Sequence, residues 1–144
     1  MTKKFKDMKG VIAIATTPFN NKNLIDFESV DRLSNYYIES KVSGVTILGV
    51  MGEAHKLNIE EQKLLIKRYI NNLINSIPVI VGVSNAGIDN LELLSKFAMD
   101  AGASGVMISG NNGLKNDDQI KSYFNQVVDR TQDIPICLQD YPPT

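Results

Sequence analysis

The segment 48–57, Leu-Gly-Val-Met-Gly-Glu-Ala-His-Lys-Leu, combines residue types that can bind an anion through the backbone. It follows the apolar, β-branched run 44–47 and precedes a helical pattern, so it turns a strand into a helix. Gly49 and Gly52 free the backbone to turn sharply and to bring its N–H groups close to a ligand. In parallel α/β proteins such a corner is where ligands bind. The segment indicates a candidate ligand site, although a plain turn eased by glycines fits the same residues.

Three side chains near or beyond this corner carry reactive groups, and each also fits a structural role. Glu53 either orients loops by accepting backbone N–H hydrogen bonds or favours the positive end of the next helix, and we expect a structural role. His55 is the only histidine, which excludes a metal site built from several histidines, and we expect it at the surface or in an oligomer contact. Cys137, the only cysteine, is expected to pack as a small hydrophobic side chain in a buried strand. We expect no metal and no cofactor.

The elements that must position the corner are five short apolar runs, about thirty residues apart. They are rich in Val and Ile and scarcely alternate with polar residues, as expected for parallel strands buried on both faces. Their ranges are residues 11–15, 44–48, 78–83, 105–109 and 135–138. Helical patterns lie between them, the first over residues 26–40, and Asn58 with Glu61 predicts a capping box that opens the second. The expected inward-facing helical residues are Phe27, Val30, Leu33, Tyr37 and Ile38, then Leu64, Leu65, Tyr69 and Leu73, then Leu91, Leu94, Phe97 and Ala98, and finally Ile120, Tyr123, Phe124 and Val127.

This order predicts an α/β fold of four βα units followed by a fifth strand. Residues 42–47 resemble residues 103–108, and this repeat over two βα units suits a (β/α)8 TIM barrel built from repeated pairs. No Gly-x-Gly-x-x-Gly follows the first strand, which disfavours an open doubly wound sheet. A complete barrel needs about 250 residues. We therefore expect residues 1–144 to form the amino-terminal half of a barrel domain, with strands one and five as unpaired edges.

Composition excludes several classes of function. The chain has 15 Lys and Arg against 16 Asp and Glu, so its net charge gives no field that attracts nucleic acid or an anionic membrane. No apolar run approaches the roughly 20 residues of a membrane span, and the basic start lacks the apolar stretch of a secretion signal. A single cysteine rules out an internal disulfide framework and fits a reducing compartment. We expect a cytoplasmic protein with no nucleic-acid and no membrane partner.

Motifs in one fixed order cover almost the whole chain. Residues 10–19 begin with Gly-Val and end with Thr-Pro-Phe, and residues 49–53 follow the pattern Gly-x-x-Gly-Glu. Residues 78–82 read Pro-Val-Ile-Val-Gly, residues 101–105 read Ala-Gly-Ala-Ser-Gly, and Pro142 follows the fifth strand. In this order and spacing they resemble the dihydrodipicolinate synthase and N-acetylneuraminate lyase family of class I aldolases and lyases.

The resemblance implies a (β/α)8 barrel, commonly in a homotetramer, that binds pyruvate or another 2-keto acid as a Schiff base on a lysine. The protonated imine then acts as an electron sink for making or breaking the adjacent C–C bond, or for eliminating water. The family's lysine lies on strand six, which this chain does not contain, so we expect the 144 residues alone to be inactive. The implied binding site for the substrate carboxylate, with the N–H groups of the middle two residues as donors, is Gly49, Val50, Met51 and Gly52.

Several implied site positions depart from the family pattern. The synthases carry threonines at the positions of Val50 and Met51, one of them in a hydroxyl proton relay with two tyrosines, and both hydroxyls are missing here. Gln139 stands at the position of the tyrosine on strand five. Tyr141, two residues later, is either a candidate to replace that tyrosine or a packing residue at the edge of the barrel, and we expect packing. The residues expected to line the site are Thr17, Glu53, Asn112 and Gln139.

We therefore expect half of a lyase or dehydratase acting on a 2-keto acid, either pyruvate or a 2-keto-3-deoxy sugar acid, in a protein that is tetrameric when complete. Three alternatives remain. One is dihydrodipicolinate synthase proper. Another is a half-barrel that associates with a second copy and is structural or binds ligand without turnover. The third is a phosphate- or flavin-binding barrel, whose usual phosphate loops follow strands seven and eight.

Overall fold

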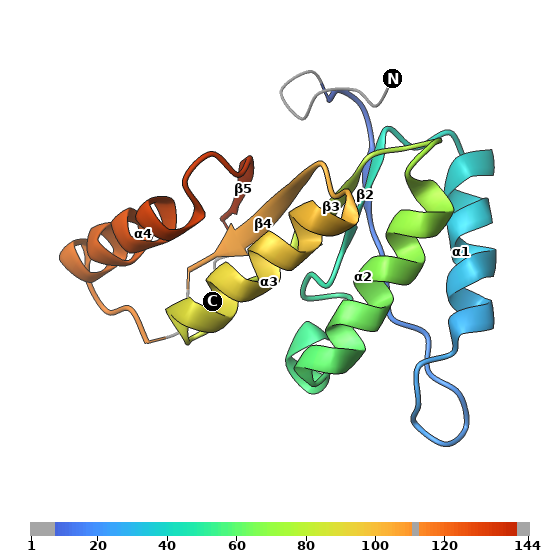
Figure 1. Cartoon of the computed structure of the whole chain (residues 1–144), viewed down its shortest axis with the longest axis horizontal. Helices are drawn as coiled ribbons and strands as arrows, with labels where there is room; N and C mark the ends of the chain where they lie inside the picture. The colour runs from blue at the N-terminus through green and yellow to red at the C-terminus, as the bar shows by residue number, and fades with distance from the viewer. Residues whose placement is uncertain (1–7, 111–112, 141–144) are drawn as a thin grey trace.

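The structure, a computed structural model, describes residues 8–110 and 113–140. Five strands form one parallel sheet, and each strand pairs only with its neighbours in sequence (Figure 1). The strands are β1 (Ile12–Ile14), β2 (Gly44–Ile47), β3 (Val79–Gly82), β4 (Gly105–Ser109) and β5 (Ile136–Gln139). The helices are α1 (Phe27–Glu39), the short 3₁₀ helix η2 (Ala54–Lys56), α2 (Ile59–Leu73), α3 (Ile88–Ala101) and α4 (Asp117–Thr131). The expected strands and main helices are confirmed.

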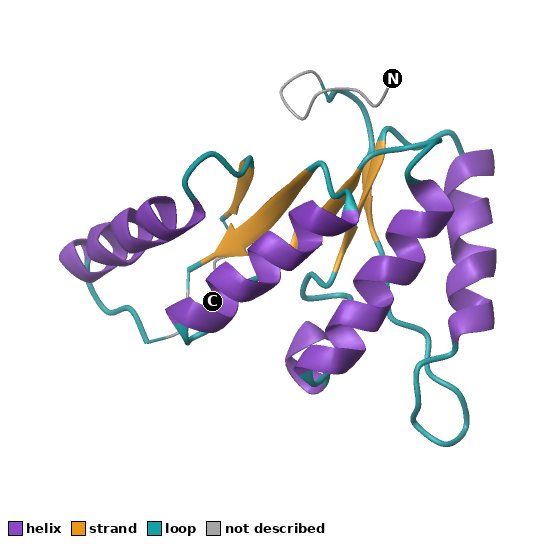
Figure 2. Cartoon of the chain, viewed as in Figure 1, coloured by secondary structure: helices purple, strands orange, loops and turns teal. Residues whose placement is uncertain are grey.

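The strand order separates a barrel from an open doubly wound sheet. Connections between parallel strands are right-handed, so an order of β1-β2-β3-β4-β5 without reversal places every helix on the same face of the sheet. Figure 2 shows α2 and α3 in front of the strands, with α1 and α4 at opposite ends of the row. Neighbouring helices contact one another in sequence order. The chain is therefore half of a (β/α)8 barrel, as predicted.

Local sequence signals fix the ends of the helices. Asp26 caps α1 by accepting a hydrogen bond from the backbone N–H of Ser29. The predicted capping box at α2 is present, because the Asn58 and Glu61 side chains each accept a hydrogen bond from the other residue's backbone N–H. Helix α3 ends at Gly102, whose φ of 106° lies in the left-handed region that a glycine adopts without strain. These signals set the length of each βα unit and hence the position of the loops.

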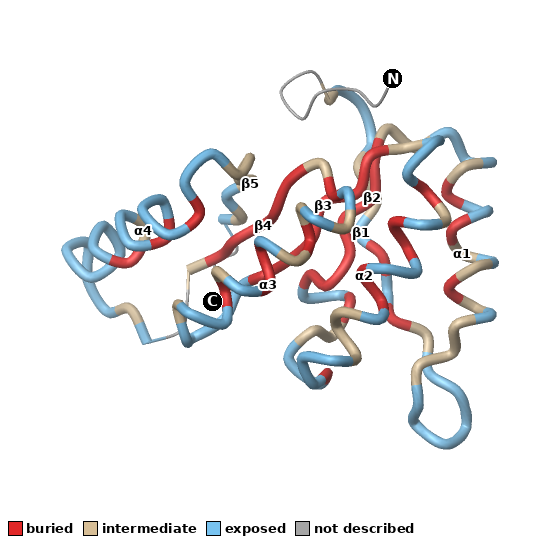
Figure 3. The backbone as a smooth tube through the Cα atoms, viewed as in Figure 1, coloured by how far each residue is buried: buried red, intermediate tan, exposed pale blue. Residues whose placement is uncertain are grey.

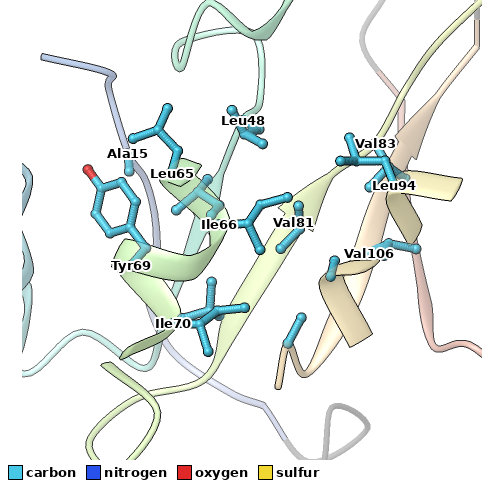
Figure 4. Packing of buried hydrophobic residues seen from close by; sticks show 14 of the residues in the cluster. Ala15, Leu48, Leu65, Ile66, Tyr69, Ile70, Val81, Val83, Leu94 and Val106 are labelled. Carbon is cyan, nitrogen blue, oxygen red and sulfur yellow. The ribbon is translucent and has the colours of Figure 1, made fainter. Parts of the chain in front are cut away.

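The main hydrophobic core lies between the sheet and the helices. Strand residues such as Val45, Val81 and Val106 belong to this cluster, whereas the alternate residues Thr46 and Met107 lie outside it, as the two-residue period of a strand requires. Figure 3 shows burial concentrated along β2, β3 and β4, with exposed residues on the outer sides of the helices. In the close-up, side chains of α2 lie against the strands (Figure 4). The alternate strand residues form the opposite, concave face.

The edge strands differ from the expectation of burial on both faces. Strands β2, β3 and β4 are buried throughout, but Ile14 on β1 is 38% exposed and Leu138 on β5 is 62% exposed. Cys137 is only partly buried, which corrects its expected place in a buried strand. The physical reason is that β1 and β5 have a neighbour on one side only in the described part of the chain.

Two helical residues expected to face the core point outward instead. Leu64 on α2 is 54% exposed and Ile120 on α4 is 40% exposed. Each lies at the border of the apolar stripe of its own helix. The buried residues Tyr69 on α2 and Tyr123 on α4 lie at the centres of these two stripes. Among the helices of the described residues, none is long and apolar enough to cross a membrane.

Candidate functional site

A cavity of about 120 Å³ opens at the carboxyl ends of β2, β3, β4 and β5. Its lining residues are Leu48, Gly49, Val50, Ala54, His55, Gly82, Ser84, Met107, Ser109 and Gln139. Pockets for drug-sized ligands enclose roughly 300–1,000 Å³. This cavity is smaller than such pockets and opens at the edge of the sheet where parallel α/β proteins bind ligands.

The corner after β2 leaves two backbone donors unused. The N–H of Gly52 donates to the carbonyl of Gly49 at 3.0 Å, and the N–H of Glu53 donates to the carbonyl of Val50 at 3.1 Å. Within the described residues, no acceptor bonds the N–H groups of Val50 and Met51. Gly49 and Val50 line the cavity, whereas Met51 and Gly52 lie just beyond its lining. Two adjacent free N–H groups can bind an anionic oxygen pair.

The corner bends over the end of β3 because Gly82 has no side chain. A Cβ placed at Gly82 would lie 2.2 Å from the carbonyl oxygen of Leu48, far inside any allowed contact. Leu48 itself has a φ of 55°, a left-handed conformation that costs a residue with a side chain about 1–2 kcal/mol. The backbone strain at Leu48 and the close approach at Gly82 therefore belong to one arrangement that brings Gly49 and Val50 to the cavity.

Thr17, expected to line the site, holds the corner from behind instead. It follows β1, is 7% exposed, and its Oγ1 donates a 2.6 Å hydrogen bond to the carbonyl oxygen of Gly52. The described Thr17 side chain is not part of the cavity lining. It is a positioning residue that ties the loop after β1 to the corner after β2.

Glu53 also lies outside the lining, and its carboxylate pairs with the ammonium group of Lys56. The hydrogen bond from Lys56 lowers the pKa of the Glu53 carboxyl below its ordinary value. The Glu53 side chain makes no capping hydrogen bond to η2, so its partner is this lysine rather than backbone N–H groups. His55 is exposed, as expected, and it also contributes to the cavity lining.

A row of polar side chains closes the other side of the cavity. Ser109 ends β4 and is aligned in register with Gln139 at the end of β5. Its Oγ lies 3.1 Å from the Oγ of Ser84, and its backbone N–H donates to the same Ser84 oxygen at 2.9 Å. Sequence reasoning named Gln139 but missed both serines. The available signal was their position at the carboxyl ends of successive strands.

Two expected site residues, Asn112 and Tyr141, lie outside the described residues. Among the described residues, no lysine belongs to the cavity lining. Across residues 8–110 and 113–140, no group of three or more His, Cys, Asp or Glu side chains could hold a metal ion. The site that the described residues form is thus built from backbone N–H groups, two hydroxyls, an amide and an imidazole.

Comparisons with known proteins match this half-barrel. The chain is 31% identical over 135 residues to 4-hydroxy-tetrahydrodipicolinate synthase of Methanocaldococcus jannaschii, covering 93% of this chain and 46% of that enzyme. It is 32% identical over 136 residues to an uncharacterized DapA-like lyase of Pyrococcus horikoshii, covering 94% of this chain and 46% of that protein. The chain therefore spans about half the length of these relatives.

Solved structures agree in fold. The crystal structure of dihydrodipicolinate synthase from Rhodopseudomonas palustris superimposes with a TM-score of 0.87 at 45% identity, over 92% of this chain and 44% of that one. The prophage protein YagE of Escherichia coli K12, solved in complex with pyruvate, gives a TM-score of 0.85 at 27% identity, over 93% of this chain and 45% of that one.

A family model described as the dihydrodipicolinate synthetase family matches residues 7–144, which is almost the entire chain. The order of the strands, the glycine corner after β2 and the alignments to relatives all support the same family assignment. The chain belongs to the dihydrodipicolinate synthetase family.

Proposed function

We propose that this chain forms the amino-terminal half of the active site of a class I lyase or aldolase, and that it holds the carboxylate of a 2-keto acid. The observation that carries the proposal is the pair of adjacent, unused N–H groups of Val50 and Met51 beside the cavity. The pyruvate bound by the related YagE protein supports a keto acid as the ligand.

In the proposed mechanism, this chain binds the substrate carboxylate and a later strand supplies the lysine that forms the imine. Fixed N–H donors stabilise a carboxylate without having to reorient, and they set the position of the neighbouring ketone carbon. A lysine amine attacks that carbon and expels water to give the imine, whose protonated form accepts the electron pair of the bond that breaks. Since no lysine lines the cavity in the described part of the chain, the proposal assigns this amine to a further strand that pairs with β5.

The side chains at the site favour a lyase or dehydratase over the synthase itself. A proton relay needs hydroxyl groups, and Val50 and Met51 supply none. Gln139 lines the cavity at the position where a phenol would be expected, and an amide neither gains nor loses a proton at ordinary pH. These side chains support substrates of the pyruvate or 2-keto-3-deoxy sugar acid type. We also propose that the complete protein is a homotetramer, by analogy with the family.

Amide chemical shifts of the isotopically labelled chain test the carboxylate site. Pyruvate should shift the amides of Val50 and Met51 saturably, whereas acetone, which has the ketone but no carboxylate, should leave them in place. The amides of Gly52 and Glu53 are internal controls because they already donate within the turn. Equal responses to pyruvate and acetone, or no saturable response to pyruvate, would contradict the proposal.

Borohydride reduction tests the assignment of the lysine. In the presence of pyruvate, the mass of the 144-residue chain should remain unchanged. A chain extended through the strand after β5 should gain the mass of a reduced pyruvate adduct on one lysine of the added segment. An adduct on a lysine within residues 1–144 would overturn the assignment.

A further inference from the structure

Two serine hydroxyls from different strand ends form a pair inside the candidate site. Ser84 follows β3 and Ser109 ends β4, and both residues line the cavity. The two Oγ atoms lie 3.1 Å apart, which is hydrogen-bonding distance. The backbone N–H of Ser109 donates to the Ser84 Oγ at 2.9 Å, so that oxygen is fixed in position. Ser109 is nearly fully buried, whereas Ser84 is exposed to the cavity opening.

Counting hydrogens shows that this pair must retain one unused donor. Each serine hydroxyl carries one hydrogen, and a single hydrogen bond within the pair uses one of the two. Whichever serine donates, the hydroxyl hydrogen of the other finds no acceptor among the described residues. Because both side chains line the cavity, that hydrogen is available to a ligand.

Gln139 extends the pair into a row with both donor and acceptor capacity. Its position on β5 is in register with Ser109 on β4, and it lines the same cavity. In the described part of the chain its carboxamide makes no hydrogen bond, so its oxygen can accept and its nitrogen can donate. A ligand hydroxyl can use both capacities at once, because it accepts from a serine and donates to the amide oxygen.

We infer that the Ser84–Ser109 pair is a specificity-determining hydrogen-bond donor that selects 2-keto acids carrying a hydroxyl group on the chain beyond the ketone. This inference rests on the proposed function, which places the carboxylate at the N–H groups of Val50 and Met51. The same cavity is lined by Gly49 and Val50 at the corner and by Ser84 and Ser109 at the ends of β3 and β4, so a ligand that crosses it from the corner reaches the serine pair. A hydrocarbon chain in the same place would leave the serine donor and the Gln139 amide without a partner.

The test compares two acids that differ by one hydroxyl, 2-oxobutanoate and 4-hydroxy-2-oxobutanoate, each titrated into the full chain and followed by amide chemical shifts. The wild-type chain should bind the hydroxylated acid roughly two- to tenfold more tightly, the range of one neutral hydrogen bond. The Ser109 amide should shift with that acid and not with 2-oxobutanoate, because its acceptor is Ser84.

The double variant Ser84→Ala/Ser109→Ala should bind the two acids with an affinity ratio of about one, because neither side chain can then donate to the ligand hydroxyl. Each single variant keeps one hydroxyl and should keep part of the preference. Ser104→Ala is the matched control, because Ser104 precedes β4 at the opposite end of the strand and its variant should keep the full ratio.

A ratio of about one in the wild-type chain would overturn the inference while leaving the proposed function intact, provided that both acids shift Val50 and Met51. A preference that persists in the double variant would overturn it in the same way. If neither acid nor pyruvate binds, the proposed function fails and the inference fails with it.

Discussion

The hydroxyl of Thr17 donates a 2.6 Å hydrogen bond to the carbonyl oxygen of Gly52, a residue 35 positions further along the chain. This contact joins the loop after β1 to the corner after β2, and both residues are buried. The conformation of the candidate carboxylate site thus depends on a side chain from a different βα unit.

Thr17→Val should lower the free energy of unfolding by roughly 1–3 kcal/mol, because it leaves the buried carbonyl of Gly52 without its donor. It should also change the amide shifts of Val50 and Met51. Chemical denaturation and amide spectra measure the two effects. Thr16→Val is the control, since the neighbouring Thr16 side chain is exposed and makes no described hydrogen bond. Equal stability of the two variants would contradict this positioning role.

Gly82→Ala should destabilise the chain by roughly 1–3 kcal/mol, the usual cost of forcing extra volume into a packed site. The added methyl group would meet the carbonyl oxygen of Leu48, and only movement of the corner can relieve that overlap. Gly110→Ala provides a comparison, because the nearest atom to its added Cβ is 3.9 Å away. Midpoints of urea denaturation should fall for the first variant and stay near the wild-type value for the second.

Asp31→Asn should reduce the pH dependence of the free energy of unfolding. Hydrogen bonds from Arg68 and then from Asn72 hold the pKa of the Asp31 carboxyl below its ordinary value of 3.8. A carboxyl whose pKa is lower in the folded state adds stability above pH 3.8, and this stability is lost as the pH falls through the folded pKa.

The variant should therefore be less stable than the wild type at neutral pH, by about 1 kcal/mol at most because the pair is solvent-exposed. The difference should vanish in strong acid. Thermal denaturation over a pH series measures it. Asp129→Asn, whose side chain has no ion pair within the described residues, is the control, and it should cost less stability at neutral pH than Asp31→Asn.

Leu138→Lys should reduce self-association of the chain. Leu138 is an exposed apolar residue on β5, and an unpaired edge strand is a template for pairing with another chain. A charged side chain there opposes that pairing. Leu64→Lys is the control, because it introduces the same charge at an equally apolar, exposed residue on α2, away from the edge strand.

Size-exclusion chromatography separates the outcomes. A folded symmetric dimer that only Leu138→Lys dissociates would support the alternative that two half-barrels associate through their edges. A wild-type chain that elutes only as aggregate or as disordered monomer would remove that alternative. Identical elution of the two variants would show that β5 is not the contact.

The sequence predicted those parts of the fold that depend on local patterns. Runs of Val and Ile marked the strands, and the Asn58–Glu61 pair marked the start of α2, because each signal lies within a few residues. The helical period was less decisive at the borders of an apolar stripe, where Leu64 turned out to be exposed. The partial exposure of Cys137 followed from strand pairing, which local sequence does not reveal.

The candidate site also has one part that local sequence predicted and another part that depends on tertiary structure. The glycine corner was visible because the glycines and the free N–H groups lie in one short segment. The Ser84–Ser109 pair was missed because it depends on how the ends of β3 and β4 align in space. The bond from Thr17 to Gly52 was missed for the same reason, and Thr17 was assigned to the lining instead of to the support behind it.

The unbroken order of the strands has a consequence for how the chain is made. Each strand from β2 to β5 pairs with the strand that precedes it, so contacts stay short in sequence and the loop-closure cost of each step is small. We expect each βα unit to dock onto the units before it soon after it leaves the ribosome. The corner after β2 would then reach its final conformation once β3 has docked, because the corner bends over Gly82 of that strand.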